Sequence, residues 1–225
     1  AASMTTLTLT KHHGLGNDFL VLFDPPDVDH ALLAIRLCNR RTGLGADGLL
    51  LAHDAEGYAA QMTLYNADGS RAEMSGNGIR CFAQAVAARR GDLDPQLILT
   101  DAGDRVVVLA STDDEYTISA QVEMGEVGVI DEPLGWAALA CHPDRPVAHL
   151  TMGNPHSIVG VDEVTAVDLA DLGGKVPHVN LEIVEPGPES NAITMRVHER
   201  GAGITLACGT GACASAYAAA QWGLA

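Results

Sequence analysis

The chain is poor in basic residues, in aromatic residues and in long apolar runs. Its 225 residues include 13 lysines and arginines against 29 acidic residues, a net charge of −16. This charge repels phosphate backbones, so nucleic acid is excluded as a partner. No apolar run approaches the roughly 20 residues that span a bilayer, which argues against a membrane protein. A hydrophobic content of 47% indicates a folded globular chain, long enough for one large domain or two modest ones.

Paired cysteine motifs are also missing. The five cysteines form an odd set without CxxC spacing, which excludes a disulfide framework and a structural zinc site and predicts reduced thiols: Cys38, Cys81, Cys141, Cys208 and Cys213. The adjacent His12 and His13 would point to opposite faces of a strand, so the histidines predict no metal either. Ala1 to Met4 resemble residues left by a cloning vector. The residues that follow lack the pattern of a secretory leader, and a cytoplasmic location is predicted.

What the sequence does contain is short alternating segments typical of β-strands. They cover residues 7–10, 19–23, 47–52, 61–65, 105–110, 116–122, 156–161 and 192–197. Helices are expected over about 30–40, 77–90 and 210–222. Because strands and helices do not alternate regularly, the pattern predicts an α+β fold rather than a βαβ fold.

Two features of the sequence recur in the same order. The segment from Ser75 to Gly78 and the segment from Cys208 to Gly211 each open an alanine-rich helix, at an offset of 208 − 75 = 133. Upstream, Gly-Asn at 16–17 recurs at 153–154, at an offset of 154 − 17 = 137. The repeat predicts two pseudo-symmetric β-rich domains, 1–123 carrying Ser75 and 124–225 carrying Cys208, each a barrel-like sheet around a central helix. Small side chains on all faces predict that both helices are buried.

The starts of these two helices are candidate sites. Backbone N–H groups at a Gly-x-Gly helix start, together with the helix dipole, can bind a carboxylate or phosphate. A cysteine there is expected to have its pKa lowered into the range of roughly 3.5–7.5, so Cys208 is predicted to be a reactive thiolate. By pseudo-symmetry, Ser75 and Cys208 would face each other across one ligand. Two acid/base groups beside an anion site describe two-base proton transfer at the α-carbon of an amino acid.

Two cofactor-dependent chemistries fit less well. A pyridoxal enzyme needs a Schiff-base lysine, and the two lysines lie in a strand-like segment (Lys11) and a glycine-rich loop (Lys175) without a phosphate site. The segment from Gly209 to Ala214 matches the GxGxxA pattern of dinucleotide-binding enzymes. It lacks both the βαβ context and the acidic residue expected about 20 positions later. No cofactor is therefore predicted.

Six ordered blocks of sequence are similar to the signatures of diaminopimelate epimerase and run through nearly the whole chain. They are KHHGLGNDF (11–19), RTGLGADG (41–48), YNADGSRAEMSGNGIRCFA (65–83), MGNPHSIV (152–159), VN (179–180) and HERGAGITLACGTGACASA (198–216). The resemblance implies a fold of two similar domains, each with a sheet around a central helix, and an active site between them. It also implies cofactor-independent epimerisation of LL-2,6-diaminopimelate to the meso isomer, a step towards lysine and peptidoglycan.

The resemblance also implies roles for individual residues. The two catalytic cysteines of the family match Ser75 and Cys208. Gly76 and Asn77, with Gly209 and Thr210, would bind the carboxylate at the reacting end of the substrate. The remaining substrate-binding positions are Asn17, Asn66, Asn154, Asn180, Glu199 near the reacting amine, and Arg200. Arg200 is suited to the distal carboxylate because its planar fork binds a carboxylate through two hydrogen bonds. His156 is a candidate for orienting an acid/base group.

The sequence departs from the family pattern in ways that leave alternatives open. Ser75 stands where a catalytic cysteine is expected, and Cys81 lies more than a turn further along the helix and cannot replace it. The second domain is expected to be incomplete at its C-terminal end. The chain could instead act on proline or hydroxyproline as a racemase or dehydratase, or bind amino acids without catalysis. A small-molecule amino-acid substrate is expected in each case, and a homodimer stays open.

Overall fold

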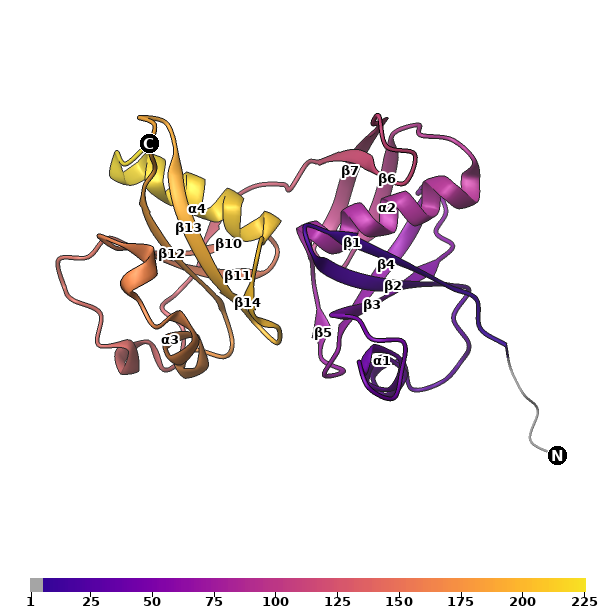
Figure 1. Cartoon of the computed structure of the whole chain (residues 1–225), viewed down its shortest axis with the longest axis horizontal. Coiled ribbons are helices and arrows are strands. Elements are labelled where there is room, and N and C mark those ends of the chain that lie inside the picture. Colours follow the sequence, from indigo (N-terminus) through magenta and orange to yellow (C-terminus); the bar gives the residue numbers. More distant parts are fainter. Residues whose placement is uncertain (1–5) are drawn as a thin grey trace. The chain divides into compact units, whose positions relative to one another are not determined.

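A computed structural model describes residues 6–225, and the chain divides into two compact units, one ending at Glu123 and the other beginning at Met124 (Figure 1). The prediction that Ala1 to Met4 derive from a vector concerns residues outside the described part. Because the positions of the two units relative to each other are not determined, each unit is described by itself.

Unit 1 consists of a curled sheet and two α-helices. Its elements are β1 (Leu9–Gly14), β2 (Asn17–Phe23), α1 (His30–Cys38), β3 (Gly48–His53), β4 (Ala60–Asn66), β5 (Arg71–Ala72), α2 (Gly76–Arg90), β6 (Gln96–Thr100), β7 (Gly103–Ser111) and β8 (Ile118–Val122). The strand order is β1-β2-β3-β4-β6-β7-β8, with β5 paired to β4. Helix α2 contacts both edge strands, β1 and β8, as well as β2, β3, β4 and β7, so the sheet curls around it.

Apolar side chains on both faces of this sheet explain its two layers. Ile79 and Phe82 of α2 are completely buried inside the curl. On the outer face, Leu20 and Leu49 pack against α1. A capping residue marks one end of each helix. At the start of α1, the Asp29 side chain accepts a hydrogen bond from the Leu32 N–H. After the last residue of α2, Gly91 forms the C-cap in the left-handed region, with φ +78°.

Unit 2 has a second sheet with helices on both faces. Its elements are β9 (Gly128–Val129), the 3₁₀ helix η1 (Trp136–Leu139), β10 (Val147–Thr151), β11 (Pro155–Gly160), the 3₁₀ helix η2 (Val164–Ala166), α3 (Leu169–Lys175), β12 (Asn180–Pro186), β13 (Ile193–Glu199), β14 (Gly203–Thr205) and α4 (Gly209–Trp222). The strand order is β14-β13-β12-β11-β10-β9. Helix α4 lies along β10 to β13 (Figure 1).

Alternate side chains of β12 pack on the two opposite faces of this sheet. Val184 packs with Ala214 and Ala218 of α4 in one apolar cluster. Leu181 and Ile183 belong to a second cluster with η1 and α3. This alternation is the period of two of a β-strand. It assigns Glu182, between Leu181 and Ile183, to the face covered by α4.

The two units repeat one order of elements. In unit 1 the antiparallel pair β1–β2 is followed by α1, a parallel pairing of β2 with β3, the antiparallel strand β4, the short strand β5 and α2. In unit 2 the pair β10–β11 is followed by α3, a parallel pairing of β11 with β12, the antiparallel strand β13, the short strand β14 and α4. This shared order supports the predicted repeat, and the predicted α+β class with a barrel-like sheet around a helix is confirmed.

Some local predictions were wrong. The sequence predicted both repeated helices to be buried all round, but α4 has one buried face, and Ala212, Cys213, Ala216 and Tyr217 are exposed. Lys175 was expected in a loop and instead lies in the last turn of α3. Strands β5, β6, β9, β10, β12 and β14 were missed. Of these, β12 has buried residues on both faces and therefore shows no alternation of polar and apolar residues.

Candidate functional site

The predicted residues of unit 1 gather at one end of its sheet. Asn17 begins β2 and Asn66 ends β4, and the pairing places the start of β3 between them, because Gly48 pairs with both Phe19 and Asn66. The start of α2 reaches the same end. There the Asn77 amide donates to Asn17 Oδ1 at 3.2 Å. Asn66 is tied locally instead, since its Nδ2 donates to Ser70 Oγ at 3.0 Å.

Ser75 is the N-cap of α2. Its backbone is extended, and its Oγ accepts the N–H of Gly78 at 3.0 Å. This satisfies one of the helix's unpaired donors, which is why serine is favoured at this position. The residues that follow, Gly76 and Asn77, contribute the first N–H groups of α2, which have no acceptor within the helix. Ser75 is half-buried, whereas Gly76 and Asn77 are buried.

Hydrogen bonds and ion pairs that the sequence did not predict hold the side chain of Asn17 in place. Asp47 Oδ2 accepts from Asn17 Nδ2 at 2.7 Å, and Arg40 bridges Asp47 and Asp18 at 2.7 and 2.6 Å. Burial raises the pKa of Asp18, but hydrogen bonds and charges from Arg40 and Lys11 outweigh burial and hold that pKa well below its ordinary value. The signal was present in the sequence, because Asp18 and Asp47 lie in the first two family-like blocks.

The predicted residues of unit 2 gather at one end of the second sheet. Asn180 begins β12 beside His156 of β11, its parallel partner, and Glu199 ends β13. The Asn180 side chain donates to Pro155 O at 3.0 Å and accepts the Arg200 N–H at 2.8 Å, which fixes the backbone that carries Arg200.

Cys208 is the N-cap of α4, as Ser75 is of α2. Its Sγ accepts the N–H of Gly211 at 3.3 Å and lies 3.4 Å from Thr210 Oγ1. Gly209 and Thr210 supply the first N–H groups of α4. The Thr210 hydroxyl also accepts from Asn154 Nδ2 at 3.3 Å. The tertiary structure therefore brings together Asn154, Thr210 and Cys208, three of the residues predicted for this half.

The sequence-based prediction that Cys208 has a lowered pKa is wrong for this structure. Burial raises the pKa of Cys208 strongly, and the nearby Glu199 and Glu182 raise it further. Hydrogen bonds from Thr210 and Gly211 act in the opposite direction but do not prevail. The prediction considered only the helix start, whereas desolvation and neighbouring carboxylates oppose a thiolate more strongly than a helix start favours it.

Two carboxyl groups, one half-buried (Glu199) and one completely buried (Glu182), lie close to this thiol. Burial raises the pKa of Glu199, although hydrogen bonds from Thr205 and Cys208 lower it in part. Glu182 is completely buried, and its Oε1 is 2.7 Å from His156 Nδ1. Sequence reasoning missed Glu182. The available signal was a charged residue inside an otherwise apolar strand, LEIV, where a buried charge requires a partner.

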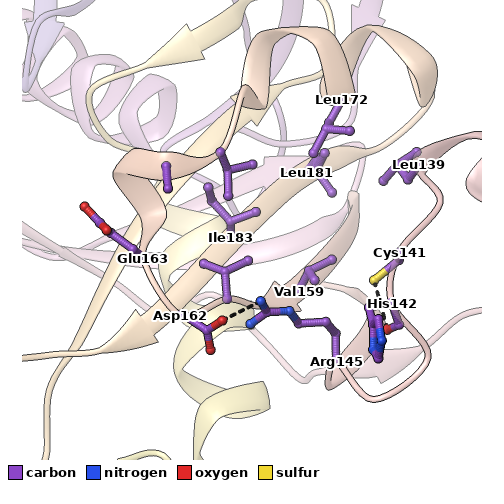
Figure 2. Close-up of a pocket in the computed structure, with 13 residues that line it drawn as sticks. Leu139, Cys141, His142, Arg145, Val159, Asp162, Glu163, Leu172, Leu181 and Ile183 are labelled. Carbon is purple, nitrogen blue, oxygen red and sulfur yellow. Dashed lines mark hydrogen bonds and ion pairs between the residues drawn. The ribbon is translucent and has the colours of Figure 1, made fainter.

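A pocket of about 470 Å³ in unit 2 lies away from these residues. Its wall includes Leu181 and Ile183, which occupy the face of β12 opposite Glu182. Figure 2 shows Arg145 paired with Asp162 beside the apolar residues of this pocket. The distance from Arg145 Nη2 to Asp162 Oδ2 is 2.6 Å. None of the predicted site residues lines it. The candidate site of unit 2 is therefore the start of α4 and not this pocket.

Residues 6–225 contain neither a candidate metal site nor a candidate membrane-spanning helix. Within this range, no three or more His, Cys, Asp or Glu side chains are grouped so that they could hold a metal ion. No helix in the same range is long and apolar enough to cross a membrane.

Comparison with known sequences agrees with the six blocks. The family model "Diaminopimelate epimerase" matches residues 9–130 and 149–225. A diaminopimelate epimerase from Halothermothrix orenii is 34% identical, over 97% of this chain and 84% of the relative. Diaminopimelate epimerase 1 from a Nostoc species is 38% identical, over 96% of this chain and 85% of the relative.

Solved structures show the same fold at low sequence identity. A hydroxyproline epimerase from Agrobacterium vitis superposes with a TM-score of 0.73 at 15% identity, covering 97% of this chain and 78% of that one. A predicted epimerase from Pseudomonas aeruginosa gives a TM-score of 0.68 at 14% identity, covering 94% and 78%. Both likenesses concern the fold, whereas the sequence matches cover nearly the whole chain at 34–38% identity. With both helix starts lying inside the matched residues, the chain belongs to the diaminopimelate epimerase family.

Proposed function

We propose that this protein interconverts LL- and meso-2,6-diaminopimelate by proton transfer at the α-carbon, without pyridoxal phosphate. The observation that carries the proposal is Cys208, a buried thiol that caps a helix inside a sequence block of the family and lies beside Glu199 and Thr210. A thiol in this environment can exchange a proton with a carbon acid, because it is shielded from water and accepts hydrogen bonds from the helix start.

The other predicted residues provide binding groups suited to an amino acid with two carboxylates. In the proposal, the first N–H groups of α2 and α4 bind the carboxylate at the reacting end, where the helix dipoles favour an anion. Arg200 binds the distal carboxylate. Asn17, Asn66, Asn154 and Asn180 offer donors and acceptors without net charge, which suits the zwitterionic ends of the substrate. Glu199 lies near the reacting amine.

Ser75 occupies the position of the second acid/base group, and its chemistry differs from that of a thiol. A hydroxyl group has a far higher pKa than a thiol, so Ser75 remains protonated unless a neighbouring base activates it. In the proposal, Ser75 can donate a proton slowly but cannot act as a base. The enzyme is therefore impaired in inversion, while proton exchange on the Cys208 side is retained.

Loss of the Arg200 side chain should weaken diaminopimelate binding. Replacing it with alanine removes a charged hydrogen-bonding group, which is expected to cost about 1.5–3 kcal/mol of binding free energy. Calorimetric titration with meso-diaminopimelate measures the change. The matched control is Arg145→Ala, because Arg145 pairs with Asp162 at the pocket away from the start of α4. Equal affinities of the two variants would show that Arg200 does not bind the distal carboxylate.

Oxidation should distinguish the natural chain from a variant with a cysteine at position 75. With Ser75 in place, mild oxidant is expected to leave Cys208 without an intramolecular disulfide. Cys81 is buried, and its pKa is raised to about 12, chiefly by burial. Cys213 lies on the exposed face of α4. In Ser75→Cys, a disulfide between residues 75 and 208 is expected if both groups flank one substrate carbon.

Peptide mapping after oxidation reads out this prediction. A bridge from Cys208 to Cys81 or Cys213 in the natural chain would contradict the proposed placement of the thiol. The absence of any bridge in the Ser75→Cys variant would contradict the proposed pairing of positions 75 and 208.

A thermal-shift screen separates the proposed substrate from its alternatives. Stabilisation by diaminopimelate isomers is expected, with little response to proline, hydroxyproline or NAD, because Arg200 and the helix starts form two separate anion-binding groups. Stronger stabilisation by hydroxyproline would favour the proline-racemase type of activity instead. A cytoplasmic location is proposed because the five free cysteines suit a reducing compartment.

A further inference from the structure

A chain of hydrogen bonds runs beneath the start of α4 and ends at Glu182. Cys208 Sγ lies 3.4 Å from Thr210 Oγ1, and Asn154 Nδ2 donates to that hydroxyl at 3.3 Å. Asn154 Oδ1 lies 3.1 Å from His156 Nε2, and His156 Nδ1 lies 2.7 Å from Glu182 Oε1. All five side chains are buried, so water does not compete for these contacts.

With Asn154 Nδ2 facing Thr210 and Asn154 Oδ1 facing His156, the hydrogen bonds between His156 and Thr210 run in one direction. Asn154 Oδ1 is an acceptor, so His156 Nε2 must carry a hydrogen and donate it. The opposite ring nitrogen, Nδ1, shares a proton with Glu182 Oε1, whichever of the two atoms holds it. Asn154 then presents its N–H₂ group to Thr210, whose oxygen accepts and whose own hydrogen is left to donate. The remaining neighbour of that hydroxyl is Cys208 Sγ.

Glu182 is placed as the fixed end of this chain. Its carboxyl group is completely buried, and among the described residues its Oε2 has no hydrogen-bond partner. A buried carboxyl group with an unpaired oxygen is costly and calls for an explanation. The helix start also approaches it closely, since a Cβ at Gly211 would lie 2.4 Å from Glu182 Oε1 and 3.2 Å from Cys208 Sγ. Only glycine fits there.

We propose that Glu182 is a positioning residue, which holds His156 in the form that donates from Nε2 and thereby makes the Thr210 hydroxyl donate to Cys208 Sγ. With the N–H of Gly211, this gives the sulfur two donors. Two hydrogen bonds favour the thiolate, against the opposing effects of burial and of the carboxyl groups of Glu199 on β13 and Glu182 on β12. His156 on β11 is a third titratable group of this cluster. The catalytic meaning of this arrangement depends on the proposed function of Cys208, but the arrangement itself does not.

Thiol reactivity in the absence of substrate tests the last link of the chain. The rate of Cys208 alkylation by iodoacetamide is followed against pH by mass spectrometry of its peptide. Thr210→Val removes the donor and should lower the rate near neutral pH by about tenfold, which corresponds to one unit of pKa. Thr210→Ser keeps the donor and should react like the natural protein. Equal rates for these two variants would overturn the proposal.

Variants of Glu182 test the end of the hydrogen-bond chain opposite Cys208. Glu182→Met removes the partner of His156 Nδ1 and should slow Cys208 alkylation by about threefold or more. Glu182→Gln still offers His156 an amide donor and should preserve the natural rate. If Glu182 acted only through its charge, both substitutions would speed alkylation. The Met variant should have no further effect in a Thr210→Val background, whereas additive effects would exclude action through Thr210.

Two further measurements keep the test decisive. The ring nitrogen resonances of His156 in the natural protein should show a hydrogen on Nε2, and a bare Nε2 would overturn the proposal. Glu189→Met, a matched change at an exposed loop residue, should leave Cys208 alkylation unchanged. If Glu182→Met does not fold, the Thr210 pair and the His156 resonances still decide. None of these readouts needs diaminopimelate, so they stay valid if the proposed substrate is wrong.

Discussion

Replacing Ser75 with cysteine is expected to speed the inversion of diaminopimelate by about 10²–10⁴-fold, the usual contribution of a positioned acid/base group. Ser75 caps α2 in the same way as Cys208 caps α4, so a thiol at position 75 would occupy the matching place in the repeat. A thiol loses its proton far more readily than a hydroxyl, and the variant would have a competent group at both positions. Conversion of LL- to meso-diaminopimelate, followed by chiral chromatography, gives the rate.

A second cysteine variant controls for the mere addition of a thiol. Ser111→Cys places a new thiol at an exposed position at the end of β7 and should leave inversion unchanged. If Ser75→Cys inverts diaminopimelate no faster than the natural protein, Ser75 does not occupy the position of a missing base. The two-base interpretation of the site would then fail, even though family membership would stand.

The exchange of the α-proton with solvent should depend almost entirely on Cys208. In deuterated buffer, the natural protein is expected to label the α-carbon with retention of configuration, because Cys208 can remove and return a proton on its own side while Ser75 seldom completes inversion. Cys208→Ala should lower labelling by about 10²–10⁴-fold. Mass spectrometry of the recovered diaminopimelate measures the label, and chiral separation measures the epimer.

The pH dependence of this labelling follows from the raised pKa of Cys208. Burial, Glu199 and Glu182 all disfavour the thiolate, so the basic form is scarce at neutral pH and becomes more abundant as the pH rises towards the raised pKa. The labelling rate should therefore increase with pH through the neutral and mildly alkaline range. A rate that is flat above pH 7 would indicate that a bound substrate restores a low pKa.

Cys213→Ser is the matched control for Cys208→Ala. Cys213 lies on α4 five residues beyond Cys208, but its side of the helix is exposed. In the described part of the chain, its side chain makes no hydrogen bond to a predicted site residue. This variant should keep the natural labelling rate. Loss of labelling in Cys213→Ser would indicate that the reactive thiol had been assigned to the wrong cysteine.

Most of the candidate site could be predicted because its residues lie in short continuous blocks. Asn17, Asn154 and the segments that open α2 and α4 each stand beside a glycine that the local structure needs, and these signals survive without knowledge of the fold. The cap residues Ser75 and Cys208 were identified in this way, and the structure places each at the start of its helix. The element order was also predictable in outline, because alternation and alanine-rich helices are local patterns.

The sequence by itself determined the α+β class and the two helix starts, since each depends on residues close together along the chain, and it indicated the repeat because the same short local patterns occur twice. The tertiary structure alone decided what surrounds Cys208. The parallel register of β11 and β12 places Asn180 beside His156, and Glu182, two residues on, bonds to that histidine beneath the start of α4. It also reversed the expected pKa shift of Cys208, because a helix start acts locally, whereas desolvation and the charges of Glu199 and Glu182 depend on how β12 and β13 pack against α4.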